Sequence, residues 1–146
     1  MMRWLLFVHI ASVAFWLGGA ATLYLLYRSS MRLSSQDAVP VTYSATRSAV
    51  WGILNPSALL VLFTGIAMMV QLGLAGKPKP FWLTFMEQFG GTVALVSAGT
   101  LSWQLRRLDR ASSAEERTRR WRTLNRTIAS VGAGVAVTIF VVAMRL

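Results

Sequence analysis

Apolar residues gather in four long stretches along the chain, and polar links separate them. The stretches are residues 4–27, 49–74, 81–105 and 127–144. A helix needs about 20 apolar residues to cross the ~30 Å hydrocarbon layer of a bilayer, and each stretch approaches or exceeds that length. Lipid offers no partner for backbone N–H and C=O groups, so each stretch must satisfy its own groups as a helix. The pattern therefore predicts a single all-α domain over residues 1–146, an integral membrane four-helix bundle.

The first stretch, from Trp4 to Tyr27, has no lysine, arginine or carboxylate, and it holds the chain's only histidine, His9. It exceeds the roughly 7–15 apolar residues of a signal-peptide core, and it stays apolar beyond the small residues at 18–21. We therefore expect a retained first helix rather than a cleaved signal peptide.

The links and one proline punctuate the pattern. Residues 28–47 are polar and serine-containing, and we expect an interfacial loop there with room for a short amphipathic helix. Residues 76–80 form a clear break, with two prolines and a glycine. Residues 106–126 hold eight arginines and three acids, which suits a solvated helix end at the lipid headgroups. Within the second stretch, Asn55-Pro56 is expected to kink the helix or mark its first turn, because proline lacks a backbone donor.

The charge distribution predicts the orientation. Basic residues outnumber acidic ones by 15 to 5, a formal net charge of +10. Most flank the apolar stretches, which favours anionic lipid headgroups over nucleic acid as their partner. Eleven lie in the links at 28–47 and 106–126, and four lie on the opposite side: Arg3, Lys77, Lys79 and Arg145. By the positive-inside rule, both termini face outward and the arginine-rich loop is cytoplasmic. We expect a multi-pass protein of a cell membrane such as the bacterial inner membrane.

This topology brings one imidazole and one carboxylate, His9 and Glu87, to a similar depth near the outer face. Met68, Met69 and Met86 fall in the same half. Imidazole and thioether groups together can ligate haem iron or Cu(I). Each residue also has a structural interpretation: a hydrogen-bonded or interfacial histidine, an interfacial carboxylate, and methionines that fill gaps between helices.

Polar side chains near the starts of the second and fourth stretches lie at a comparable depth. They are Asn55, Asn125 and Arg126, and we expect the asparagines to pair across the bundle. A structural role is favoured over a substrate contact. Small residues recur at every fourth position of the third stretch, which favours close helix packing: Gly90, Ala94, Ala98 and Ser102.

Several chemistries are excluded by what the chain lacks. It has no cysteine, so disulfides, thiolate metal sites and a thiol nucleophile are ruled out. The chain offers no distinctive nucleophile to pair with its one histidine, so the sequence does not indicate a hydrolase site. No glycine-rich strand-to-helix motif is present for a nucleotide.

Spaced residues in all four stretches form a further pattern. His9 is followed by Trp16 seven residues later and then by Gly19. The later stretches add Asn55-Pro56 with Gly65, Trp103 with Arg106-Arg107, and Leu124-Asn125. Together these residues resemble the pattern of HemJ-type protoporphyrinogen oxidases, which are small four-helix membrane proteins that bind b-type haem. CopD-type copper-resistance proteins share a similar first-helix pattern.

The resemblance implies haem b bound by His9, with Trp16, Met68 and Met86 at the cofactor. If the chain is an enzyme, the resemblance implies an oxidoreductase. The chain departs from the family in its third stretch, which has no lysine where the family carries one tied to activity. Glu87 is a candidate for part of that lost polar site. Whether the chain is an enzyme is therefore left open.

Three functions follow. The first is a haem-b protein for membrane redox chemistry. The second is a copper-handling membrane protein, with His9, Met68 and Met69 as Cu(I) ligands. The third is a non-catalytic accessory subunit of a membrane complex. The expected partners are a bilayer with anionic headgroups and either a second copy or a larger complex, without nucleic acid.

Overall fold

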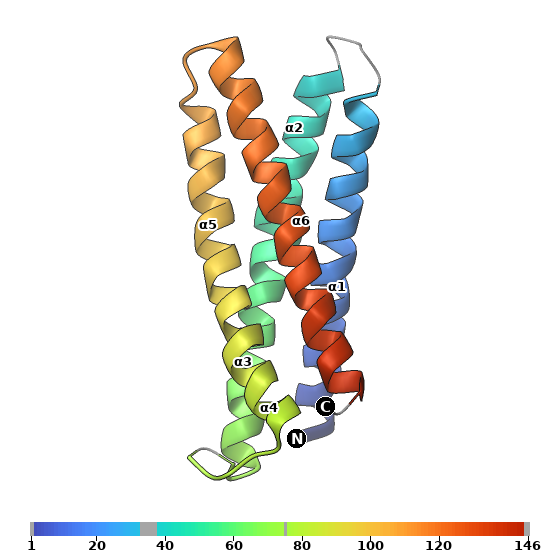
Figure 1. Cartoon of the computed structure of the whole chain (residues 1–146), viewed down its shortest axis with the longest axis vertical. Coiled ribbons are helices and arrows are strands. Elements are labelled where there is room, and N and C mark those ends of the chain that lie inside the picture. Colours follow the sequence, from blue (N-terminus) through green and yellow to red (C-terminus); the bar gives the residue numbers. More distant parts are fainter. Residues whose placement is uncertain (1, 33–37, 75, 145–146) are drawn as a thin grey trace.

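The computed structural model describes residues 2–32, 38–74 and 76–144, with side chains described from Thr42 onward in the second range. Its helical elements join into four rods (Figure 1). Rod 1 is α1 (Met2–Ser30) and rod 4 is α6 (Ala114–Met144). Rod 2 joins α2 (Ala38–Ala49), the π-helical segment η1 (Val50–Leu54) and α3 (Asn55–Gln71). Rod 3 joins α4 (Phe81–Phe85), the π-helical segment η2 (Met86–Gly90) and α5 (Gly91–Asp109).

The rods alternate in direction and pack as a four-helix bundle. Rod 1 packs against rods 2 and 4, and rod 3 packs against the same two. Figure 1 shows both chain ends beside the link between α3 and α4, which we call the terminal end of the bundle. The link between α5 and α6 lies at the opposite end, which we call the arginine end. The all-α, four-helix prediction is therefore confirmed.

Three helices among the described residues are long and apolar enough to cross a membrane: Met2–Ser30, Thr42–Gln71 and Ala114–Met144. Their outward faces carry large apolar side chains that are more than half exposed, such as Phe15, Phe63 and Phe140. Contiguous apolar surface of this kind marks a face that contacts lipid or another protein. Rod 3 is not among the three, and its last turn carries Arg106 and Arg107. The structure thus supports a multi-pass membrane protein.

Two rods begin earlier than their apolar stretches. Rod 2 begins at Ala38 rather than near residue 49, because the short helix expected in the first link continues directly into the second stretch. Thr46 on α2 is buried. Rod 4 begins at Ala114 rather than at 127, where the Ser113 hydroxyl accepts the Glu116 backbone N–H at 3.1 Å. This is the Ser-x-x-Glu start signal of a helix, and glutamates in the first turn favour its dipole.

Two π-helical segments interrupt the middle rods. At η1, the Asn55 backbone N–H reaches back to the Val50 carbonyl, and α3 begins at Asn55 with Pro56 in its first turn. The sequence predicts a kink or a first turn at Asn55-Pro56, and the structure places the pair where a π-helical segment passes into α3 within one continuous rod. A proline lacks the N–H of the regular ladder and crowds the carbonyl four residues earlier, and the wider turn accommodates both effects.

Glycines bring the rods into close contact. A Cβ added at Gly90 would lie 3.2 Å from Thr138 Cγ2, and one added at Gly134 would lie 3.3 Å from Val93 Cγ2. Ala94, one turn beyond Gly90, is fully buried. Gly90 of the small-residue pattern therefore serves the contact between rods 3 and 4, whereas Ser102 of the same pattern faces Asn55 on rod 2.

Candidate functional site: a cavity with one histidine

A cavity of about 640 Å³ lies inside the bundle and draws its walls from all four rods. Its volume falls within the ~300–1,000 Å³ of typical small-molecule and cofactor sites. The walls are mostly apolar, and His9 and Glu87 are the titratable side chains among them. Four-helix bundles commonly hold cofactors in this position, between facing helices. The two groups that the sequence placed at one depth thus do share one cavity.

The imidazole of His9 is held by a side chain that sequence reasoning missed. His9 Nδ1 lies 2.9 Å from Thr64 Oγ1 on α3. The Thr64 hydroxyl points back along its own helix, 2.5 Å from the Leu60 carbonyl oxygen. A hydroxyl has one proton, and here the carbonyl accepts it. Thr64 Oγ1 therefore accepts from His9, and the ring proton resides on Nδ1.

This arrangement leaves Nε2 of the neutral ring with a free lone pair. Among the described residues, the ring's hydrogen-bond partners are Thr64 Oγ1, at Nδ1, and the Val61 backbone, and Nε2 is not one of the enclosed polar atoms that lack a partner there. With the ring proton on Nδ1, Nε2 is the nitrogen that can accept a ligand. A histidine that donates its other N–H to a fixed acceptor is the usual form of a metal-ligating imidazole.

Gly65 provides the surface on which the ring rests. A Cβ added at this glycine would lie 3.5 Å from His9 Cε1 and 4.0 Å from Nδ1. Gly65 and Thr64 thus fix the ring from neighbouring positions of α3. Gly65 is one of the residues that carry the resemblance to HemJ-type proteins, and in the structure it faces the imidazole of His9.

The methionines divide between the cavity and its surroundings. Met69, which is buried, and Met86 both line the cavity. Met68 does not line it, although both cofactor and copper hypotheses included it. Adjacent residues of an α-helix point about 100° apart, since a turn holds 3.6 residues, so Met68 and Met69 cannot face one cavity equally. Met68 therefore lies outside the walls of this cavity.

Glu87 lines the cavity and has a basic partner. Its carboxylate pairs with the ammonium of Lys79, which precedes rod 3. The lysine side chain is 9% exposed and the glutamate is 45% exposed. The pair therefore sits at the edge of the site, with the carboxylate open to solvent or headgroups. In the sequence, Lys79 contributes only to the charge asymmetry that predicts orientation, and no spacing signal connects it with Glu87.

Trp16 is the cavity's most enclosed aromatic side chain. It is 2% exposed, and its Nε1 has no hydrogen-bond partner among the described residues. The seven-residue step from His9 is two helical turns, which puts both side chains on the same face of α1. The structure thus brings together His9, Trp16, Met69, Met86 and Glu87.

Asn55, Asn125 and Arg126 do not join this site, and the expected pairing of the asparagines is not formed. Asn55 Nδ2 donates to Ser102 Oγ at 2.8 Å, whereas Asn125 Nδ2 donates to the Trp121 carbonyl oxygen at 2.9 Å. Each side-chain amide donates to one of these acceptors instead of to the other asparagine. Arg126 is on the exposed face of α6, where a guanidinium avoids the cost of burial. The amide donors of both asparagines are thus occupied within the bundle, while their Oδ1 atoms have no hydrogen-bond partner among the described residues.

Carboxylate-rich metal chemistry is not built into the part of the chain described here. Those residues contain no cluster of three or more His, Cys, Asp or Glu side chains that could hold a metal ion. The donors that line the cavity are the His9 imidazole, the Met69 and Met86 thioethers and, at its edge, the Glu87 carboxylate. Comparisons with protein-family models, curated proteins and solved structures gave no match to this chain.

Proposed function

We propose that this chain is a multi-pass membrane protein that binds haem b in its central cavity for membrane redox chemistry. The observation that carries the proposal is the free Nε2 lone pair of His9 beside an apolar cavity of about 640 Å³. The positive-inside rule adds the orientation: the cavity end faces outward and the arginine end is cytoplasmic.

The residues present fit such a cofactor. Apolar walls would suit a porphyrin face, and His9 Nε2 would hold the iron. Met69 and Met86 would be the further residues able to hold it, and a thioether ligand would raise the reduction potential. Haem b, when bound, supplies one-electron redox chemistry.

The protein's own groups then have separate tasks. Thr64 and Gly65 orient the imidazole. Trp16 and the surrounding apolar side chains keep water away from the site. The Lys79–Glu87 pair lies at the exposed edge, where it fixes the entry to rod 3. The resemblance to HemJ-type proteins also favours His9 as the ligand, while the absence of a lysine in the third stretch leaves the substrate and the oxidase activity unassigned.

Absorption spectroscopy of the purified protein tests the proposal. With haem supplied during expression, the wild-type protein should show a Soret band that His9→Ala abolishes. Met69→Leu should shift or weaken the spectrum if its sulfur occupies the opposite position, while Met68→Leu, one residue away and outside the cavity, serves as the matched control. A wild-type protein that stays colourless in excess haem would contradict the proposal.

A copper-handling function is the second candidate, because His9, Met69 and Met86 line one cavity and are soft or borderline ligands suited to Cu(I). Cu(I) loading followed by metal analysis separates the two functions. Copper retention that His9→Ala and Met69→Leu abolish, in a protein that takes up no haem, would favour copper. Retention unchanged in both variants would exclude a copper site in this cavity.

A further inference from the structure

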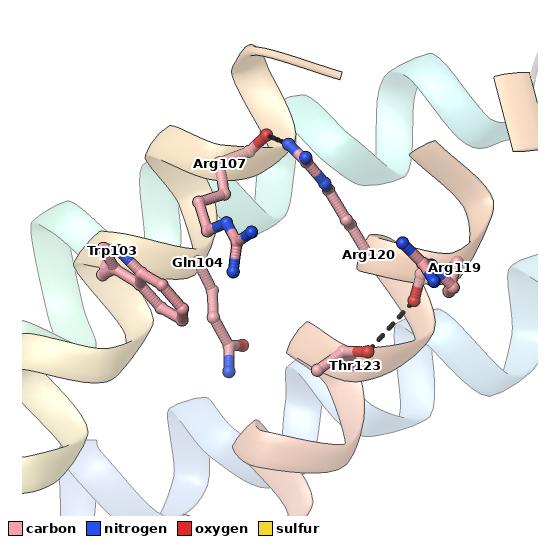
Figure 2. Close-up of a pocket in the computed structure, with 6 residues that line it drawn as sticks. All are labelled: Trp103, Gln104, Arg107, Arg119, Arg120 and Thr123. Carbon is pink, nitrogen blue, oxygen red and sulfur yellow. Dashed lines mark hydrogen bonds between the residues drawn. The ribbon is translucent and has the colours of Figure 1, made fainter. Parts of the chain in front are cut away.

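A second pocket lies at the arginine end, between α5 and α6, far along the bundle from the histidine (Figure 2). Its volume is about 280 Å³. Two elements supply its walls: Trp103, Gln104 and Arg107 from α5, and Arg119, Arg120 and Thr123 from α6. Three of these six side chains are guanidinium groups.

The three arginines are not equivalent. Arg120 is already satisfied, because one guanidinium nitrogen donates to the Arg107 carbonyl oxygen and another pairs with Glu116. Neither Arg107 nor Arg119 forms an ion pair within the described part of the chain. The pocket therefore presents two guanidinium groups outside any ion pair, with Glu116 near enough to Arg119 to interact with its charge.

Arg107 is held in place by an aromatic ring. Its guanidinium carbon lies 4.6 Å from the centre of the Trp103 ring. Figure 2 shows this guanidinium between the Trp103 ring and the α6 side chains, above the Gln104 carboxamide. A stacked guanidinium keeps its N–H edges free, and those edges match the geometry of a phosphate.

An apolar stripe leads from the arginine pocket toward the middle of the membrane. Trp103 is 55% exposed and Val96, seven residues before it on the same helix face, is 58% exposed. Between them, a Cβ added at Gly99 would meet nothing within 4 Å, so the surface there is open. Tryptophan is enriched at the level of lipid headgroups. The stripe thus offers a path for an acyl chain that ends at Arg107.

We propose that this pocket binds the phosphate of an anionic glycerophospholipid, with Arg107 and Arg119 on the phosphate and one acyl chain along Trp103, Gly99 and Val96. A soluble phosphate ester shares the headgroup chemistry, but the apolar stripe favours the lipid. An anionic headgroup is preferred over phosphatidylcholine, whose ammonium would lie beside two guanidinium groups. This site does not depend on the proposed haem function.

Native mass spectrometry of the detergent-purified protein tests the site, with phosphatidylglycerol and phosphatidylcholine added at equal concentration. The wild-type protein should retain one phosphatidylglycerol in preference to phosphatidylcholine. The variant R107Q/R119Q should retain at least about tenfold less than R106Q/R122Q, because each charge-assisted bidentate contact exceeds the general attraction of a basic surface. The control removes the same charge from exposed neighbours on the same two helices.

Equal losses in the two double variants, or equal binding of the two lipids by the wild type, would overturn the proposal. Release of bound lipid by millimolar glycerol phosphate would assign the pocket to a soluble phosphate instead and would overturn the lipid assignment. If R107Q/R119Q does not fold, Arg119→Gln alone replaces it, with Arg122→Gln as its control. A loss confined to Arg119→Gln supports the site, and equal retention by both single variants counts against it.

Discussion

His9 and Thr64, which lie 55 positions apart in the chain, are joined by a hydrogen bond of 2.9 Å between Nδ1 and Oγ1. The bond links rod 1 to rod 2 inside the bundle and determines which imidazole nitrogen is free. Since the Thr64 hydroxyl donates to its own helix, the direction of the bond to His9 is set by the backbone. An ordinary helical threonine thereby orients the one histidine of the chain.

The first prediction concerns this threonine. Thr64→Val keeps the side-chain shape and removes the acceptor for Nδ1–H. Loss of such an orienting partner typically lowers metal affinity about 10–100-fold. A haem titration followed by absorbance should show this loss for Thr64→Val. Thr92→Val is the matched control, because the Thr92 hydroxyl bonds only the Gln88 carbonyl of its own rod. Equal affinity in the two variants would show that Thr64 does not orient the ligand.

The second prediction concerns two adjacent glycines of α1 with opposite surroundings. A Cβ at Gly19 would lie 2.8 Å from Leu54 Cδ1 and 3.3 Å from Ile53 Cγ2, whereas a Cβ at Gly18 would meet nothing within 4 Å. Gly19→Ala should therefore lower the stability by about 1–3 kcal/mol through overpacking. Gly18→Ala should be neutral or stabilising by up to about 1 kcal/mol, because alanine is the better helix former. Thermal unfolding in detergent measures both, and a larger loss for Gly18→Ala would contradict the packing described here.

The third prediction tests the orientation. The chain has no cysteine, so a single introduced cysteine reports its side of the membrane without background. Lys77→Cys at the terminal end should react with a membrane-impermeant maleimide added to intact cells. Ala114→Cys at the arginine end should react only after the membrane is permeabilised. Labelling in the reverse order would invert the proposed topology and would place the histidine cavity on the cytoplasmic side.

The four-helix bundle and the similar membrane depth of His9 and Glu87 could be predicted from the sequence, because segment length and alternating direction determine depth. It could not separate Met69 from Met68, since the two methionines lie at nearly the same depth and differ only in their direction around the helix. The two π-helical segments add to this difficulty, because each shifts the phase of the side chains that follow.

Other features depend on contacts between residues distant in the chain. The Thr64 contact with His9 requires rods 1 and 2 to be in place, whereas the Lys79–Glu87 pair forms within eight residues at the start of rod 3. The early start of α6 is different, because Ser113 and Glu116 form a capping pattern that can be recognised in the sequence alone. The dense arginines around this start favour a solvated helix end at the lipid headgroups, and this interpretation obscures the capping pattern.

Nitrogen NMR of the protein labelled with ¹⁵N-histidine tests the state of the imidazole, since His9 is the only histidine in the chain. We expect one neutral ring with its proton on Nδ1 and a bare Nε2, and we expect added haem to perturb the Nε2 resonance most strongly. A ring protonated at Nε2, or a spectrum that haem leaves unchanged, would contradict this expectation.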